Sequence, residues 1–191
     1  MYRRVLAIDP GPTESAYVAL FDGWTINAFG KVPNAKLIGE IEFAQYGVEC
    51  VAIEMIASYG MAVGAEVFDT CVWIGRFMQT AIRTNIPESR VSLIKRMEVK
   101  LHCCKSPKAN DANIRQALID RWGGEEKALG AVKCATCKGR QVVGLGKRRG
   151  PCPTCAGSGW REPPGPLHRV KADAWAALAL AVTWWDMRRG E

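Results

Sequence analysis

The sequence lacks an apolar run long enough to cross a membrane. The longest run, residues 174–185, is shorter than the roughly 20 residues that a transmembrane helix needs. A signal peptide is not visible either, because the opening MYRRVLAIDPG reaches Asp9 before a long apolar run develops. Internal repeats and low-complexity tracts are also missing. We therefore expect a soluble, cytoplasmic protein rather than a membrane, secreted or fibrous one.

The composition is that of an ordinary globular chain that carries a basic surplus. The 191 residues are 48% hydrophobic and 24% charged, which predicts one main domain with a packed core. Lysine and arginine outnumber aspartate and glutamate by 26 to 19, a net charge of +7. Such a surplus is common in proteins that bind phosphate backbones, although alone it does not specify a partner.

The order of the expected elements defines the fold class. Three short β-favouring runs open the chain, at residues 3–8, 15–21 and 24–32, the last two joined by an Asp22-Gly23 hairpin turn. Apolar spacing then predicts a helix over 33–46, a strand over 48–53, a helix over 63–83, a strand over 90–94, a helix from 110 and a helix over 170–187. This order matches an α/β, ribonuclease H-like fold, with a mixed five-stranded sheet flanked by helices.

Three carboxylates stand where such a fold gathers functional groups. Asp9 and Glu54 each end an expected buried strand, and Asp173 begins an otherwise apolar helix. Carboxylates that crowd together are tolerated when hard divalent cations bind between them. Two such cations roughly 4 Å apart can activate water against a phosphodiester. The trio therefore predicts a metal-dependent nuclease.

Each of these acids also has a purely structural interpretation. Asp9 precedes Pro10-Gly11 and could serve only as a turn residue, while Glu54 could cap the helix that begins near Gly60. Asp173 could be a first-turn acid that the helix dipole favours. If these three interpretations are independent, all of them must hold together to explain the trio, so the trio is a stronger signal than any one of its members.

Four segments resemble the RuvC superfamily, in particular the compact RuvC-like Holliday junction resolvases of phages and prophages. They are IDPGPTESAYVAL from Ile8, AIEMIASYGMAVGAEVFDT from Ala52, MEVKLHCCKSPKANDANIRQALIDRWGG from Met97 and PGPLHRVKADAWAALALAVTWW from Pro164. Together they cover most of the chain outside a cysteine-rich stretch, and their order and spacing agree with the family.

The resemblance implies a homodimeric endonuclease that depends on Mg²⁺ or Mn²⁺ and cuts branched DNA, with catalytic acids Asp9, Glu54 and Asp173. Many cellular RuvC proteins carry a further acid three residues along the last helix, where this chain has Ala176. Asp111 is a possible fourth carboxylate, although a helix N-cap role is the alternative.

Two further residues are candidates for contacts with DNA. Lys100 lies in a lysine-bearing stretch of the phage-type proteins and could contact phosphate, or could simply be solvated. Tyr59 could stack on an unpaired base, or could only pack against the protein.

Residues 131–163 have a different character and predict an inserted zinc loop within a nuclease domain formed by 1–130 and 164–191. Two CxxC pairs supply four thiolates for a tetrahedral zinc site, at Cys134, Cys137, Cys152 and Cys155. A disulfide pair or an iron site fits a cytoplasmic chain less well. The other four cysteines, Cys50, Cys71, Cys103 and Cys104, are interpreted as core residues.

The zinc loop is strongly basic. No acidic residue lies between Ala128 and Gly159, whereas six cations do: Lys133, Lys138, Arg140, Lys147, Arg148 and Arg149. Fixed cations on a zinc-stiffened loop suit contact with a DNA backbone. The alternative is a structural clasp that stabilises the fold.

The sequence thus predicts a structure-specific DNA endonuclease that resolves Holliday junctions or other branched DNA. One rival is a non-catalytic, zinc-containing nucleic-acid-binding protein on a ribonuclease H-like fold. Another is an actin-like or sugar-kinase-like ATPase, whose fold opens with a similar strand ending in Asp-x-Gly. Such proteins need a second lobe and a second phosphate loop, for which 191 residues leave little room.

Overall fold

The computed structural model describes residues 4–42, 46–58, 60, 64–130, 132–138, 140–144, 149–162 and 164–188. The chain divides into two compact units. The first comprises Met1–Arg115 and Val170–Glu191, and the second comprises Gln116–Arg169, which contains the predicted zinc loop. None of the helices that the structure describes is both long and apolar enough to span a membrane.

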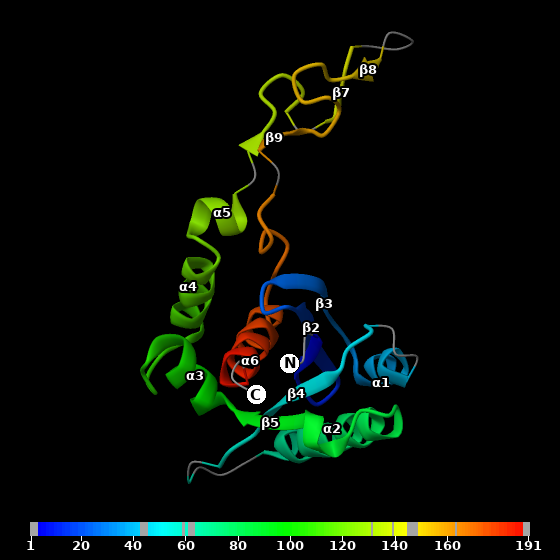
Figure 1. Ribbon diagram of the computed structural model, residues 1–191, viewed down its shortest axis with the longest axis vertical. Helices are drawn as coiled ribbons and strands as arrows, with labels where there is room; N and C mark the ends of the chain where they lie inside the picture. Colours follow the sequence, from blue (N-terminus) through cyan, green and yellow to red (C-terminus); the bar gives the residue numbers. More distant parts are fainter. Residues whose placement is uncertain are drawn as a thin grey trace. The chain divides into compact units, whose positions relative to one another are not determined.

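A mixed five-stranded sheet forms the centre of the first unit (Figure 1). Its strands are β1 (Arg4–Asp9), β2 (Glu14–Phe21), β3 (Thr25–Pro33), β4 (Cys50–Met55) and β5 (Val91–Lys95). They lie in the order β3-β2-β1-β4-β5. The pairs β3–β2 and β2–β1 are antiparallel, and the pairs β1–β4 and β4–β5 are parallel. The predicted mixed five-stranded sheet is confirmed.

The hairpin between β2 and β3 turns at Asp22 and Gly23, as the sequence predicts, but its loop has three residues rather than two, because Phe21 pairs with Thr25. Asp22 and Gly23 both have positive φ, 51° and 73°, a conformation that a tight turn between twisted strands favours. The turn fixes the register of the hairpin, because a slip by one residue would carry every side chain of β2 to the opposite face.

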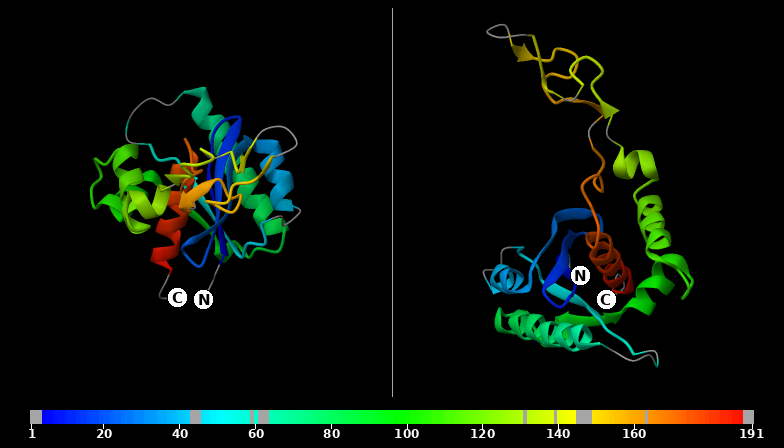
Figure 2. Two further views of the ribbon diagram at one scale, coloured as in Figure 1. Left: turned by 90° about the horizontal axis from the view of Figure 1, so that it is seen from above. Right: turned by 180° about the vertical axis from the view of Figure 1, so that it is seen from behind.

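Helices cover both faces of the sheet, and the central strands are therefore apolar on both sides (Figure 2). On one face, Leu6 and Ile8 of β1 pack with Phe77 of α2 (Ala65–Arg83) and Leu37 of α1 (Asn34–Glu42). The other face carries α6 (Ala174–Met187), whose small and large apolar residues contact β1 and β2. The helix α3 (Arg96–Cys104) packs against α6.

Two helices were not expected from the sequence. The first is α3, which follows β5 directly, and the second is the short α5 (Glu125–Leu129) after α4 (Asp111–Arg121). A short 3-10 turn, η1 (Glu88–Arg90), leads into β5. The sequence RMEVKLHCC does not indicate α3, because it lacks apolar residues at regular helical spacing. Val99 is the only fully buried residue of this helix.

The prediction that the four scattered cysteines fill the core is correct for Cys50 alone. Cys50 is completely buried, whereas Cys71 is exposed and Cys103 and Cys104 are half-buried. Cys71 lies on the outer side of α2, where Phe68 and Val72 are also exposed, at 62% and 61%.

The second unit contains two small antiparallel pairs. They are β6 (Val132–Lys133) with β9 (Trp160–Glu162), and β7 (Val142–Val143) with β8 (Gly150–Pro151). The segments that lead into and out of these pairs are joined by two backbone hydrogen bonds. Gly165 N donates to Gly130 O (2.8 Å), and Leu167 N donates to Ala128 O (2.9 Å). The close approach requires glycine at 165, since a Cβ there would lie 2.3 Å from Ala128 O.

Candidate active site at the carboxyl edge of the sheet

The strand register brings the first two predicted acids together. Ile8 of β1 pairs with Ile53 of the parallel strand β4, so Asp9 and Glu54 occupy equivalent positions one residue further on. Adjacent strands lie about 4.8 Å apart, and both side chains point to the face that α6 covers. Glu54 lies within β4 rather than after it, one residue inside the strand end at Met55.

A buried polar network fixes the turn that follows Asp9. Asn34, only 1% exposed, donates from Nδ2 to Gly11 O (2.9 Å), and its Oδ1 accepts from Ser15 Oγ (2.6 Å). The Ser15 hydroxyl in turn accepts from Gly11 N (3.3 Å). Because these groups are shielded from water, each bond holds the turn more firmly than it would at the surface.

Asp173 lies at the N-terminus of α6 and pairs with a lysine from the edge of the sheet. Its Oδ2 is 2.7 Å from Lys31 Nζ of β3, and both side chains are about half exposed, at 50% and 47%. It makes no side-chain capping bond to its own helix. The preceding Ala172 has a φ of 44°, a left-handed conformation that disfavours any residue with a Cβ and that occurs often at functional sites.

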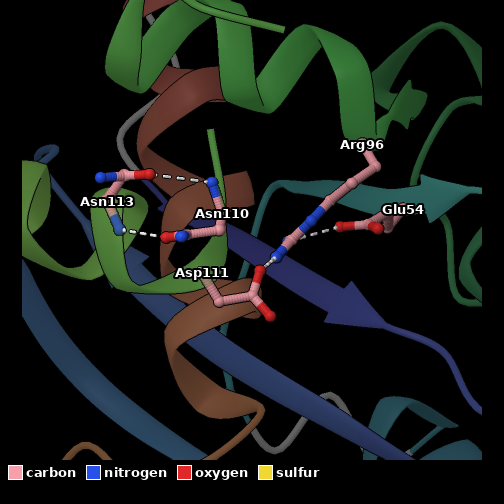
Figure 3. A network of polar contacts seen from close by, with 5 residues as sticks. All are labelled: Glu54, Arg96, Asn110, Asp111 and Asn113. Carbon is pink, nitrogen blue, oxygen red and sulfur yellow. Dashed lines mark hydrogen bonds and ion pairs between the residues drawn. The ribbon is translucent and has the colours of Figure 1, made fainter. Parts of the chain in front are cut away.

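Arg96 joins Glu54 to Asp111, as Figure 3 shows. Its Nη1 lies 3.2 Å from Glu54 Oε2, and its Nη2 lies 2.5 Å from Asp111 Oδ1. The N-cap alternative for Asp111 is wrong, because reciprocal bonds of 3.0 Å between Asn110 and Asn113 close the first turn of α4 instead. Arg96 was not predicted from the sequence. The signal that identified Asp9, a charged residue at the end of a buried strand, also applies to Arg96, which directly follows β5.

The electrostatics of these groups reflect their proximity. Burial and the charge of Glu54 raise the pKa of Asp9 from 3.8 to about 7, with Arg96 acting in the opposite direction and Asp173 and Asp111 adding to the rise. Burial raises the pKa of Glu54, while Arg96 and Lys100 oppose the rise. Partly buried carboxylates that repel one another in this way are a donor set that suits a hard divalent cation.

A cleft of about 490 Å³ opens beside these groups, lined by Asp9, Arg96, Asp111 and Asp173 together with Trp175 and Ala176. The predicted acids Asp9 and Asp173 thus line one cleft together with Asp111, and Glu54 lies beside Asp9 on the neighbouring strand. Lys100 acts on Glu54 electrostatically from α3. Tyr59 lies outside the described residues.

Four cysteines cluster in the second unit with spacings that suit a tetrahedral metal site. Their sulfur atoms all lie within 4.8 Å of one another. Cys134 and Cys152 are 3.8 Å apart and Cys137 and Cys155 are 3.7 Å apart, close to the roughly 3.8 Å between ligands of a tetrahedral zinc with 2.3 Å bonds. These distances are far too long for disulfides, whose sulfurs lie about 2 Å apart.

The thiol of Cys155 is already disposed to ionise. Burial raises its pKa, but the N–H of Gly159, which donates to its Sγ at 3.3 Å, and the neighbouring cysteines lower it to about 6. The thiolate is the form that binds a metal. The cluster could therefore hold zinc.

The predicted DNA-contacting cations of the second unit are exposed where they are described. Lys133, Lys138, Arg140 and Arg149 are all open to solvent, whereas Lys147 and Arg148 lie outside the described residues. Lys138, Arg140 and Arg149 line a shallow cleft of about 720 Å³ beside Cys137. None of the salt bridges among the described residues involves these three cations.

Solved structures of one protein share this fold. Thermus thermophilus RuvC is 18% identical, with 98% of this chain and 96% of that chain covered and a TM-score of 0.56. T. thermophilus RuvC in complex with Holliday junction substrate gives the same identity and coverage with a TM-score of 0.55. No protein-family model matches the sequence, and no curated protein is similar to it. The chain therefore has a RuvC-like, ribonuclease H-like fold, as its sequence predicts.

Proposed function

We propose that the protein is a metal-dependent, structure-specific DNA endonuclease that hydrolyses phosphodiester bonds in branched DNA, Holliday junctions above all. The observations that carry the proposal are the neighbouring positions of Asp9 and Glu54 on parallel strands of a RuvC-like sheet, and an open cleft that both Asp9 and Asp173 line. A solved relative of this fold is in complex with Holliday junction substrate, which favours branched DNA over a linear duplex.

In this proposal the three carboxylates hold Mg²⁺ or Mn²⁺ against the scissile phosphate. Divalent cations there would polarise the phosphate and lower the pKa of the attacking water, and the sequence predicts two of them. Asp9 and Glu54 are fixed by adjacent parallel strands, so they would hold the reacting groups in a constant geometry. The Ser15–Asn34 network would keep the Asp9 turn in that position.

Zinc held by the four cysteines would fold the second unit, and its cations would contact the DNA backbone. The support is the charge of Lys138, Arg140 and Arg149 around one cleft, since these three cations form no salt bridge with any residue that the structure describes. Further contacts with the DNA backbone would come from Lys133, and from Lys147 and Arg148, which lie outside the described residues. Tyr59 would stack on a base. Lys100 would contact phosphate nearer the acids.

We further propose a homodimer, encoded by a phage or prophage and acting in the cytoplasm of its bacterial host. A four-way junction is two-fold symmetric, so a symmetric dimer could present one acid cluster to each of two strands. The support within the chain is the outer face of α2, where Phe68, Cys71, Val72 and Gly75 recur at helical spacing and are exposed.

The decisive experiment incubates the protein with Mn²⁺ and three synthetic substrates: a four-way junction, a flap and a linear duplex. The wild type should cut the junction fastest, and Asp9→Asn should bind the junction unchanged while cleavage falls to the level of the metal-free protein. Lys36→Gln, which removes a surface cation on α1, is the control.

The alternative function, a non-catalytic zinc-containing nucleic-acid-binding protein, predicts junction binding with no cleavage by the wild type under any divalent cation. Equal cleavage of all three substrates would support a nuclease but contradict its specificity for branched DNA. Undiminished cleavage by pure Asp9→Asn protein would contradict the assignment of Asp9 as a catalytic residue.

A further inference from the structure

Arg96 lies among the acids of the candidate active site and forms ion pairs with two of them. It is the first residue of α3 and directly follows β5, so its side chain starts from the same sheet edge as Asp9 and Glu54. Its guanidinium lies between Glu54 and Asp111, with one nitrogen directed at each (Figure 3). The side chains of Arg96 and Glu54 are only 26% and 16% exposed.

The arginine is held from two sides by separate elements. Glu54 belongs to β4, whereas Asp111 begins α4, whose first turn is closed by the bonds between Asn110 and Asn113. The Glu54 side chain is 16% exposed and that of Asp111 is 87% exposed, so the contact with Glu54 is the one that fixes the guanidinium. A partly buried pair of this kind is difficult to replace, because removing one partner leaves a charge without compensation.

Lys31, a further cation near the acids, is held differently. Lys31 and Asp173 are both about half exposed, and exposed pairs of this type contribute little. Asp173 is therefore available to a metal ion, while Arg96 would remain in place when one binds.

The supply of ligands also limits the number of ions. α6 contributes one carboxylate to the cleft, since Asp173 is flanked by Ala172, Ala174 and Ala176. Two adjacent divalent cations need carboxylates on both sides to offset their mutual repulsion. Here a fixed positive charge already occupies the side of Glu54 that faces Asp111.

We propose that Arg96 takes the place of the second cation, so that the site binds one divalent ion through Asp9, Glu54 and Asp173 while the guanidinium neutralises charge on the scissile phosphate. This inference rests on the proposed nuclease function and narrows its predicted metal requirement. A guanidinium forms paired, charge-assisted hydrogen bonds to phosphate oxygens, and it can therefore supply the electrostatic part of a second ion's role.

The test measures Mn²⁺ binding without DNA, by electron paramagnetic resonance and calorimetry, on zinc-loaded protein so that the cysteine cluster does not contribute. The wild type should bind one Mn²⁺ per chain, and Asp9→Asn should bind none. Arg96→Gln should bind a second Mn²⁺, whereas Arg96→Lys, which keeps the charge, should still bind one. Lys36→Gln is the matched control and should behave as the wild type.

Cleavage of the junction gives an independent readout. The wild-type rate should rise hyperbolically with Mn²⁺, and Arg96→Gln should be slower by about 10²-fold and rise sigmoidally. Two Mn²⁺ per wild-type chain together with normal cleavage would overturn the inference and leave the nuclease intact. Unchanged binding and cleavage by Arg96→Gln would overturn it as well. A wild type that neither binds Mn²⁺ nor cleaves would remove both the inference and the function.

Discussion

At the scale of single residues, Asp9 is the most strongly perturbed acid of the candidate site. Its folded-state pKa, about 7, is raised above the ordinary 3.8 by burial and by Glu54. Ionising such a group opposes folding. Below about pH 4 the carboxyl is protonated in the folded and unfolded states alike and costs nothing, and the cost then grows as the pH rises through 7.

We therefore expect Asp9→Asn to stabilise the metal-free protein at pH 8, on the order of 2–4 kcal/mol at most, and to have little effect at pH 4. Urea unfolding of zinc-loaded protein without Mg²⁺ or Mn²⁺ measures the difference at each pH. An equal change in the free energy of unfolding at both pH values would contradict the assignment of the ionisation cost to Asp9.

Asn34 shows how a residue outside the acid cluster supports it. Asn34→Ala should lower the free energy of unfolding by roughly 1–3 kcal/mol, because Ser15 and Gly11 lose buried hydrogen-bond partners. Junction cleavage should also slow, as the Asp9 turn becomes free to move. The matched control is Asn27→Ala on β3, an exposed position where the change should stay within about 0.5 kcal/mol.

At the scale of elements, the small hairpins of the second unit are too short to fold on their own. Their apolar cluster consists of the cysteines with Val143, so the proposed zinc ion would supply most of their stability. Removing zinc with a chelator should make residues 132–160 exchange their amide hydrogens rapidly, while β1 and β4 stay protected. Hydrogen-exchange mass spectrometry resolves the two regions. Cys152→Ser should reproduce the effect, and Cys71→Ser, at an exposed cysteine outside the cluster, should not.

The basic cleft of the second unit leads to a prediction about salt. If Lys138, Arg140 and Arg149 contact phosphates, each substitution by glutamine should weaken junction binding and reduce the slope of log affinity against log salt by about 1. Lys36→Gln should leave the slope unchanged. A slope that none of the three substitutions alters would favour the structural-clasp role of the zinc loop.

The elements also show what sequence reasoning can reach. Strand ends, the Asp22-Gly23 turn and the CxxC pairs are local signals, and each was found because a few adjacent residues determine it. Arg96 and Lys31 were missed because their partners are remote. Lys31 lies 142 residues from Asp173, and only the register of β3 on β2 brings it near. The helix α3 was missed because most of its residues are only half-buried and Val99 alone is buried, so its sequence lacks a clear apolar stripe.

At the scale of the whole molecule, the exposed apolar face of α2 predicts self-association. Phe68→Glu should convert the proposed dimer to a monomer, since a charge at the centre of an apolar contact cannot be compensated there. Analytical ultracentrifugation across protein concentrations measures the change. Met187→Glu, at an apolar residue of α6 that is 53% exposed, is the control and should leave the assembly unaltered. A wild type that remains monomeric would exclude the dimer.

The hydrogen bonds at the base of the second unit have a consequence for the history of the chain. Because Ala128 and Gly130 lie beside Leu167 and Gly165, the polypeptide leaves and returns through nearly the same point. Everything between could be excised and the two stumps joined by a short glycine linker without stretching either one. Such a junction gives recombination a place to add or exchange a whole metal-binding cassette in one event, and it gives the protein engineer the same opportunity.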